Sequence, residues 1–153
     1  ALYERPFWRE RGLSGDGMSR RGPLVEIHDA SPRQGGPYAL FGFVGASVQQ
    51  RSDPAFLDAV RAQLVRLFGE EAGAAIAVHL QDWALETRTS TLQDRQALQG
   101  HPDYGKPAAL RDVWSCTLHF ASSEMAPEFG GYLEGALGAA EAVAERLVKA
   151  TPS

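Results

Sequence analysis

The chain has 153 residues, of which 44% are apolar and 22% charged, and its formal net charge is -4 at pH 7. This length and composition are typical of one ordinary soluble domain that can bury a core. Lysine and arginine are scattered among the acids, which excludes a basic face for nucleic acid or an anionic membrane. No apolar run approaches the roughly 20 residues of a membrane span, and residues 1–11 do not resemble a signal peptide. We therefore expect a cytoplasmic protein.

The first half of the chain predicts strands separated by glycine-rich turns. Residues 1–9 contain strand-type and aromatic residues, as though the chain began inside a sheet. Residues 23–31 and 38–46 are rich in β-branched and aromatic side chains, and the run SPRQGGP between them predicts the turn of a hairpin or meander. A proline followed by an apolar stripe predicts an amphipathic helix over residues 53–68, which Gly69 can end.

The second half predicts two further strands and a final helix. Residues 75–85 and 113–122 are apolar runs typical of strands, the second one buried, and a polar excursion over residues 87–112 separates them. Cys116, the single cysteine, is expected to be a small buried side chain. Apolar residues at spacings of three and four then predict a helix that follows the glycines of GGYLEGA. The stripe comprises Leu133, Leu137, Ala140, Ala144 and Leu147.

Between His119 and Lys149 the sequence predicts a strand, then a short turn, and then a helix whose start is rich in glycine. Such a helix start presents unpaired backbone N–H groups and the positive end of a helix dipole, where an electron-rich group could bind. Small residues also occur wherever a helix packs closely on a sheet, so a packing role stays open.

Two other kinds of site find no support. The histidines lack the paired spacing of a metal site, and we expect structural roles for His28, His79, His101 and His119. Ser14 lies in GLSGDG, which is not the Gly-x-Ser-x-Gly pattern of a nucleophile elbow. The sequence therefore favours neither a metal centre nor a hydrolase.

The run HFASSEMAPEFGGYLEGALGAAEAVAERL, which begins at His119, resembles the last flavin-binding segment of the monoamine and polyamine oxidase family. That family's pattern is an apolar residue and Phe-Ala-Gly-Thr-Glu, then Gly-Tyr, then Glu-Gly-Ala and an alanine-rich helix. Pro-Phe-Trp at residues 6–8, HDASP at 28–32, LFGFVGA at 40–46 and the pair Asp82 and Trp83 also fall in the family's order. The resemblance extends over nearly the whole chain.

This resemblance implies an α/β fold (α+β mixed) and two incomplete domains. Residues 1–112 would be part of a substrate domain built on a mixed sheet, and residues 113–153 the last strand and helix of an FAD-binding domain. The glycine-rich turn that binds the ADP end of FAD, and a lysine near the flavin, would lie in a separate amino-terminal half. We therefore expect a carboxy-terminal fragment that binds no flavin and is inactive alone.

The resemblance also assigns residues to the cofactor. Glu124, with Ser123 beside it, would accept hydrogen bonds from the ribityl part of FAD. The backbone of Gly131, Tyr132 and Leu133 would approach the pyrimidine edge of the flavin, where a helix start stabilises negative charge.

Aromatic residues would line the approach of the substrate. Tyr132 would be one wall beside the substrate nitrogen and the catalytic candidate, with Trp83 packing beside the flavin. The second wall is missing at the expected position, and Tyr104 is a candidate substitute. Core packing is the alternative role for each of these rings. Ser122 and Ser123 replace the family's Gly-Thr, which crowds an approach that a glycine would permit.

Two functions follow. The first is oxidation of a small-molecule amine to an imine, by hydride transfer to flavin with oxygen as acceptor. The alternative is a non-catalytic binding or interaction module that keeps the architecture, favoured by the two serines and the missing wall. Because partial domains leave apolar faces uncovered, we expect self-association or pairing with the amino-terminal half.

Overall fold

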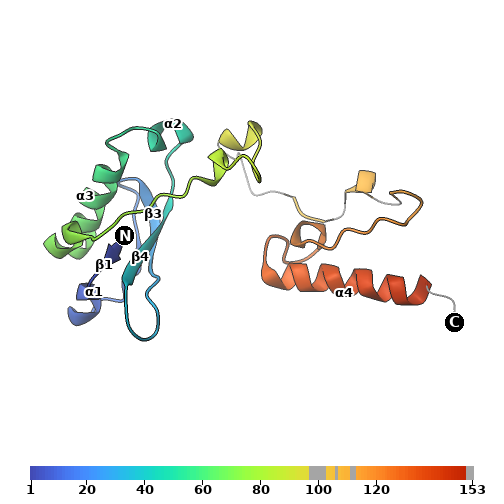
Figure 1. Ribbon diagram of the computed structural model, residues 1–153, viewed down its shortest axis with the longest axis horizontal. Coiled ribbons are helices and arrows are strands. Elements are labelled where there is room, and N and C mark those ends of the chain that lie inside the picture. The colour runs from blue at the N-terminus through green and yellow to red at the C-terminus, as the bar shows by residue number, and fades with distance from the viewer. Residues whose placement is uncertain (97–102, 106, 111–112, 151–153) are drawn as a thin grey trace. The chain divides into compact units, whose positions relative to one another are not determined.

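The computed structural model describes residues 1–96, 103–105, 107–110 and 113–150, and it divides into two compact units, Ala1–Leu98 and Gln99–Ser153 (Figure 1). This division reflects compactness alone. The assignment of residues 1–112 to a substrate domain and of residues 113–153 to an FAD domain stays a prediction.

A four-stranded sheet in the order β1-β4-β3-β2 forms the base of the amino-terminal unit. Its strands are β1 (Leu2–Tyr3), β2 (Gly17–Met18), β3 (Leu24–Asp29) and β4 (Tyr38–Val44). The predicted hairpin is confirmed, since Ile27 of β3 pairs with Gly42 of β4. The α/β class is confirmed as well, but each pairing among the described strands is antiparallel, so this part of the sheet is not mixed.

Helix α3 (Phe56–Phe68) packs on the sheet and confirms the helix predicted over residues 53–68 (Figure 1). Gly69 ends it with a φ of 95°, a backbone conformation that glycine adopts without strain. A shorter helix, α2 (Val48–Arg51), precedes it and begins with a capping box at Ser47. The core that α3 shares with the sheet comprises Tyr3, Phe7, Trp8, Leu24, Ile27, Leu40, Phe56, Val60, Leu64, Phe68 and Ala72.

Residues 1–9 are not one strand. The chain leaves β1 after Tyr3 and forms the short helix α1 (Phe7–Glu10). Phe7 and Trp8 are adjacent, and only 2% and 0% of their surfaces are exposed. A strand would direct adjacent side chains to opposite faces of the sheet, whereas one helical turn lets both rings enter the same core.

The buried side chain of Gln63 joins α3 to β3. Its Oε1 accepts a hydrogen bond from the Leu24 N–H at 2.8 Å, and its Nε2 donates to the Leu24 carbonyl at 2.7 Å. Leu24 lies where the register between β3 and β4 shifts. The amide of Gln63 thus pairs with backbone groups at the point where the ladder is irregular.

The strand predicted over residues 75–85 is largely wrong. Ala77 forms an isolated antiparallel bridge with Leu2, and residues 83–85 form a 3₁₀ turn, η2 (Trp83–Leu85), that Asp82 caps. Since β1 is two residues long, it offers few backbone groups for a longer ladder.

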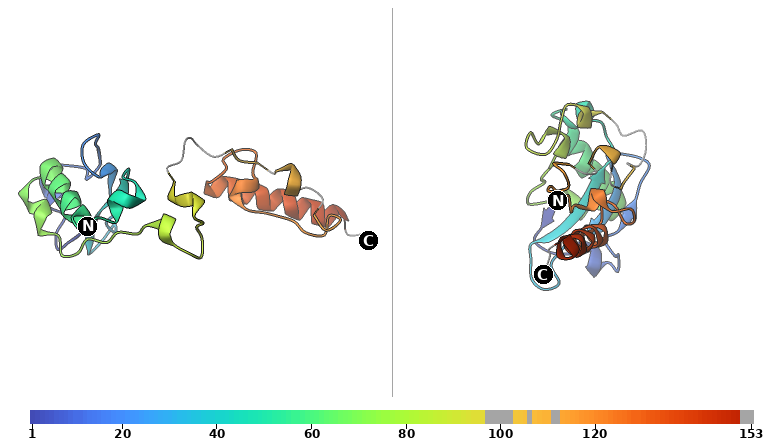
Figure 2. Two further views of the ribbon diagram at one scale, coloured as in Figure 1. Left: turned by 90° about the horizontal axis from the view of Figure 1, so that it is seen from above. Right: turned by 90° about the vertical axis from the view of Figure 1, so that its right-hand side faces the viewer.

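The long helix α4 (Leu133–Ala150) dominates the carboxy-terminal unit and confirms the final predicted helix (Figure 2). The predicted apolar stripe lies on it, but the buried residues of α4 are Gly135, Ala139 and Val143, while Leu133 and Leu137 of the stripe are 87% and 61% exposed. Ala140, Ala144 and Leu147 are exposed too. Small residues let the preceding chain approach the helix closely, and the larger side chains remain uncovered. Two 3₁₀ turns complete this unit, η4 (Ala108–Leu110) and η5 (Ser123–Met125).

The buried strand predicted over residues 113–122 is also wrong. Trp114, Ser115 and Cys116 have φ values of 51°, 53° and 65°, which belong to turns. Trp114 is 76% exposed, and Cys116 is exposed rather than buried. A strand needs a partner for its backbone groups, and the described part of this unit contains no strand with which to pair. Within the predicted excursion over 87–112, residues 97–102, 106 and 111–112 lie outside the described residues.

Candidate functional site

Glu124 lies in η5 with its carboxylate in solvent. A hydrogen bond from the Ser122 hydroxyl, together with bonds from its own N–H and from the Ser123 hydroxyl, lowers the pKa of Glu124 and outweighs the small opposing effect of burial. The carboxylate is therefore ionised at neutral pH and acts only as an acceptor. The two serines that replace Gly-Thr orient the carboxylate that they flank.

Tyr104 lies along the backbone of two glycines in the same unit. A methyl group added to Gly130 would lie 2.2 Å from Tyr104 Cγ, and one added to Gly131 would lie 2.6 Å from the Tyr104 hydroxyl oxygen. The Gly105 N–H donates to the Glu124 carbonyl at 3.0 Å, which holds the Tyr104 segment against η5. Packing against Tyr104 therefore explains the absence of side chains at both glycines.

The first turn of α4 also contains a glycine whose surroundings leave no room for a side chain. A methyl group at Gly135 would lie 2.2 Å from the carbonyl oxygen of Phe129. That carbonyl accepts a hydrogen bond from the Tyr132 N–H at 3.1 Å. The tight turn leaves the side chains of Tyr132 and Leu133 66% and 87% exposed. Within the described residues, the ring of Tyr132 is thus not part of a core.

Trp83 belongs to the amino-terminal unit, where it is 66% exposed. Asp82 caps its turn by accepting from the Ala84 N–H at 3.2 Å, and the Ser90 hydroxyl donates to the Trp83 carbonyl at 2.5 Å. Arg51 binds the Asp82 carboxylate. The other predicted site residues, Tyr104, Ser123, Glu124, Gly131, Tyr132 and Leu133, belong to the carboxy-terminal unit.

Asp29, within the HDASP run, has a structural role that the sequence did not suggest. Its Oδ2 accepts from the indole N–H of Trp8 at 2.8 Å and from Arg9 Nε at 2.6 Å, and its Oδ1 accepts from the Ser31 N–H at 2.9 Å. Burial by itself would raise the pKa of Asp29, but the hydrogen bonds from Arg9, Ser31 and Trp8 together hold it well below its usual range. Asp29 thereby ties α1 to β3.

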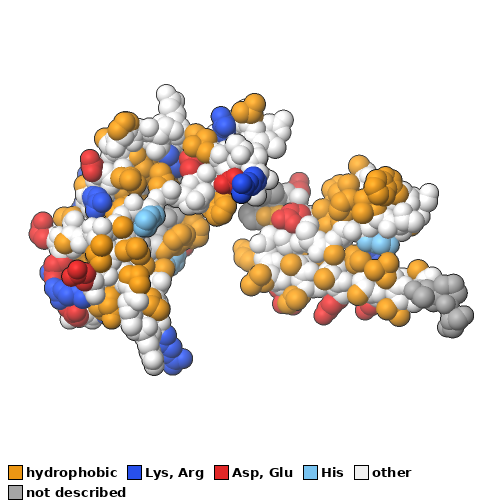
Figure 3. All heavy atoms as spheres, in the orientation of Figure 1, with side chains coloured by type: hydrophobic (Ala, Val, Ile, Leu, Met, Phe, Trp, Pro, Cys, Tyr) orange, Lys and Arg blue, Asp and Glu red, His pale blue; other side chains and the backbone are white. Residues whose placement is uncertain are grey.

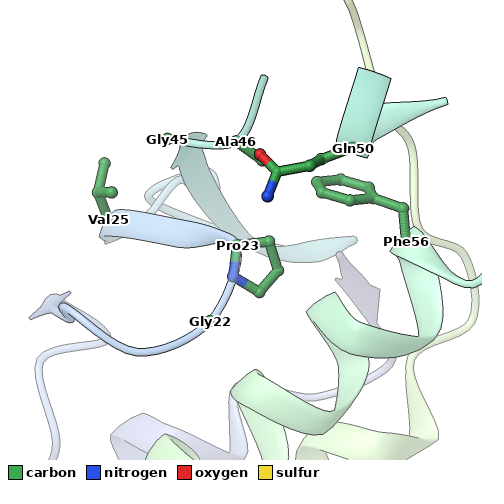
Figure 4. A pocket seen from close by; sticks show the side chains of 7 residues that line it. All are labelled: Gly22, Pro23, Val25, Gly45, Ala46, Gln50 and Phe56. Carbon is green, nitrogen blue, oxygen red and sulfur yellow. The ribbon is translucent and has the colours of Figure 1, made fainter. Parts of the chain in front are cut away.

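Two cavities lie in the amino-terminal unit. The first, of about 350 Å³, is lined by Gly22, Pro23, Val25, Gly45, Ala46, Gln50 and Phe56, with the side chains of Pro23, Gln50 and Phe56 gathered around it (Figure 4). None of these lining residues ionises. The second, of about 390 Å³, is lined by Tyr3, Glu4, Arg5, Phe7, Glu71, Ala74 and Ile76, and its Arg5 pairs with Glu71. Neither cavity contains a predicted site residue.

Two further properties bear on function. Among the described residues, no three histidine, cysteine or acidic side chains gather closely enough to hold a metal ion. Within the same residues, no helix has the length and apolar character needed to cross a bilayer. His28 instead contacts Asp16 at 3.2 Å on the surface.

Comparison with known proteins supplies the family. The model of the flavin containing amine oxidoreductase family matches residues 1–148. A Mycobacterium tuberculosis protein named as a flavin-containing monoamine oxidase, AofH, is 30% identical over 161 residues, covering 96% of this chain and 32% of that protein. An L-amino acid dehydrogenase of Synechocystis sp. is 26% identical over 160 residues, covering 95% of this chain and 31% of that protein.

A solved structure of a putrescine oxidase bound to putrescine shares the fold, with a TM-score of 0.70 and 24% identity over 97% of this chain and 34% of that one. The chain thus spans about a third of the length of the relatives that it matches. On the match over residues 1–148, this chain belongs to the flavin containing amine oxidoreductase family.

Proposed function

We propose that this chain is the carboxy-terminal part of an FAD-dependent amine oxidase, which converts a small-molecule amine to an imine with oxygen as acceptor. The observation that carries the proposal is the exposed surface of Glu124 and Tyr132, which flank the turn into α4 in a chain of this family. An amino-terminal half, corresponding to the unmatched length of the relatives, would bind most of the FAD.

The described residues fit one part of FAD well. The ionised carboxylate of Glu124, held by its serine neighbours and open to solvent, suits the hydroxyl groups of the ribityl chain. Since Tyr104 packs against the buried Gly130 while Gly131 stays exposed, we propose that the flavin edge meets the backbone of Gly131, Tyr132 and Leu133.

When bound, FAD supplies the oxidising chemistry by accepting a hydride from the carbon next to the amine nitrogen. The exposed ring of Tyr132 would orient the neutral nitrogen, with Tyr104 as the second ring near it and Trp83 beside the flavin. The apolar surfaces of the assembled enzyme would exclude water from the reacting groups. The exposed apolar side chains of both units are consistent with such assembly or with self-association (Figure 3).

The test uses the complete reading frame that encodes this chain. The purified protein, loaded with FAD, should show anaerobic bleaching of the flavin by at least one member of a panel of primary amines, polyamines and amino acids. Residues 1–153 expressed alone should carry no stoichiometric flavin.

Two outcomes would refute the oxidase assignment. If the protein encoded by the complete frame binds no flavin, the oxidase assignment is refuted. A protein from that frame that binds flavin but is reduced by none of the panel would favour the binding module.

A further inference from the structure

The Arg51–Asp82 pair is the best-shielded ion pair of the amino-terminal unit among its described residues. Arg51 Nε lies 2.6 Å from Asp82 Oδ2, and Nη2 lies 2.8 Å from Oδ1, so the two groups meet in a bidentate arrangement. Their side chains are only 15% and 12% exposed. Arg51 Nη1 also donates to the Ala46 carbonyl at 2.5 Å, which fixes the guanidinium to the chain before α2.

The pair is also the main polar attachment of the segment that carries Trp83. Beyond Ala77, whose carbonyl accepts from the Leu2 N–H at 2.8 Å, the chain leaves the sheet. Among hydrogen bonds between described residues, those of residues 78–96 are local except for the bonds from Arg51 to Asp82. The position of Trp83 therefore depends on a carboxylate one residue away.

We propose that Arg51 and Asp82 are positioning residues for Trp83, which fix the turn that carries its indole on the amino-terminal unit. Asp82 Oδ1 accepts from Arg51 and from the Ala84 N–H together, so the guanidinium fixes the carboxylate and the carboxylate fixes the turn. A lysine at position 51 would keep the charge but lose the planar, bidentate geometry. The functional consequence, displacement of the indole that would pack beside the flavin, rests on the proposed oxidase function.

The charge state of Asp82 agrees with this role. The hydrogen bond from Arg51 lowers the pKa of Asp82 and outweighs the opposing effect of burial. The carboxylate thus stays ionised through the neutral range, as a permanent anchor requires.

The first experiment needs neither flavin nor substrate. The chain is labelled with 5-fluorotryptophan, and its three indole ¹⁹F resonances are assigned by replacing Trp83 and Trp114 with phenylalanine. Arg51→Lys, Arg51→Gln and the double variant Arg51→Gln with Asp82→Asn should shift the Trp83 resonance while the buried Trp8 resonance stays in place. The double variant leaves no unpaired buried charge, so it should fold even where a single variant does not. Arg33→Gln and Asp58→Asn, both at exposed positions, are the matched controls.

The proposal would be overturned by an unchanged Trp83 resonance in Arg51→Lys and in the double variant, or by a shift of equal size in the controls. Loss of the Trp8 resonance in both variants would also overturn it, because the pair would then support the whole unit rather than Trp83.

The second experiment uses the flavin-loaded enzyme from the complete frame. Arg51→Lys should lower kcat/KM for anaerobic flavin reduction by roughly 10- to 100-fold, the effect expected when a group packed beside the reacting flavin is displaced. The rate of flavin reduction should decrease, while the amount of flavin bound per protein stays unchanged. Wild-type enzyme that no amine reduces refutes the oxidase function but leaves the ¹⁹F result standing. Active wild type with an equally active Arg51→Lys enzyme, despite a shifted Trp83, refutes the functional role of the pair.

Discussion

Replacement of Gln63 should be among the most damaging single changes in the amino-terminal unit. Gln63→Leu keeps a side chain of similar size but leaves the Leu24 N–H and carbonyl without the partners that now lie 2.8 and 2.7 Å away. Leu24 is 5% exposed and Gln63 is 0% exposed, so water does not replace the lost amide. An unsatisfied buried polar group costs about 1–3 kcal/mol, which gives a loss of about 2–6 kcal/mol in the free energy of unfolding.

Urea denaturation followed by tryptophan emission measures this loss. Trp8 is 0% exposed while Trp83 and Trp114 are 66% and 76% exposed, so the change in emission on unfolding reports mainly on the core around Trp8. Gln49→Leu, at an exposed position before α3, is the control and should change stability by less than about 0.5 kcal/mol. A Gln63→Leu chain as stable as the control would refute the assignment of Gln63 as the partner of Leu24.

Three further predictions concern the site and its supports. In the complete oxidase, Tyr132→Phe should be mild, whereas Tyr132→Ala should keep FAD and lose about 1–3 kcal/mol of transition-state stabilisation in anaerobic flavin reduction; unchanged reduction with a lower Tm would mean a packing role. Gly130→Ala should destabilise the carboxy-terminal unit by about 1–3 kcal/mol in thermal unfolding, and Tyr104→Ala should relieve most of that cost. Gly131→Ala should destabilise the unit with or without Tyr104→Ala, because the φ of Gly131 is 80°. If the effects of Gly130→Ala and Tyr104→Ala simply add, the contact between Tyr104 and Gly130 is contradicted. Since the folded-state pKa of Asp29 is depressed, its stabilising effect is complete above the ordinary value of 3.8 and is lost as the pH falls further, so Asp29→Asn should flatten the acid limb of the stability profile.

The local pattern of the sequence determined the hairpin of β3 and β4 and the helices α3 and α4. In each, the signal lies within or beside the element itself: β-branched and aromatic runs around a turn, or apolar residues at helical spacing with glycine at one end of the helix. The family resemblance was also readable, because GGYLEGA and its neighbours are contiguous and the match extends over residues 1–148.

The sequence failed where an element depends on a distant partner. The apolar runs at residues 75–85 and 113–122 are suited to strands, yet a strand forms only where another strand supplies hydrogen bonds. The first run forms a single bridge, from Ala77 to Leu2, and the second forms turns. The apolar spacing also left open which face of α4 is buried, because the approach of Phe129 to Gly135 selects the face that is covered.

Only the tertiary structure decided which side chains support the proposed site. Arg51 and Asp82 are 31 residues apart, Gln63 and Leu24 are 39 apart, and Tyr104 and Gly130 are 26 apart in the sequence. No periodicity links such residues, because their contact arises when separately formed elements pack together. Local propensity specifies which segments become helix or strand, whereas hydrogen-bond satisfaction and close packing between those segments select the partners.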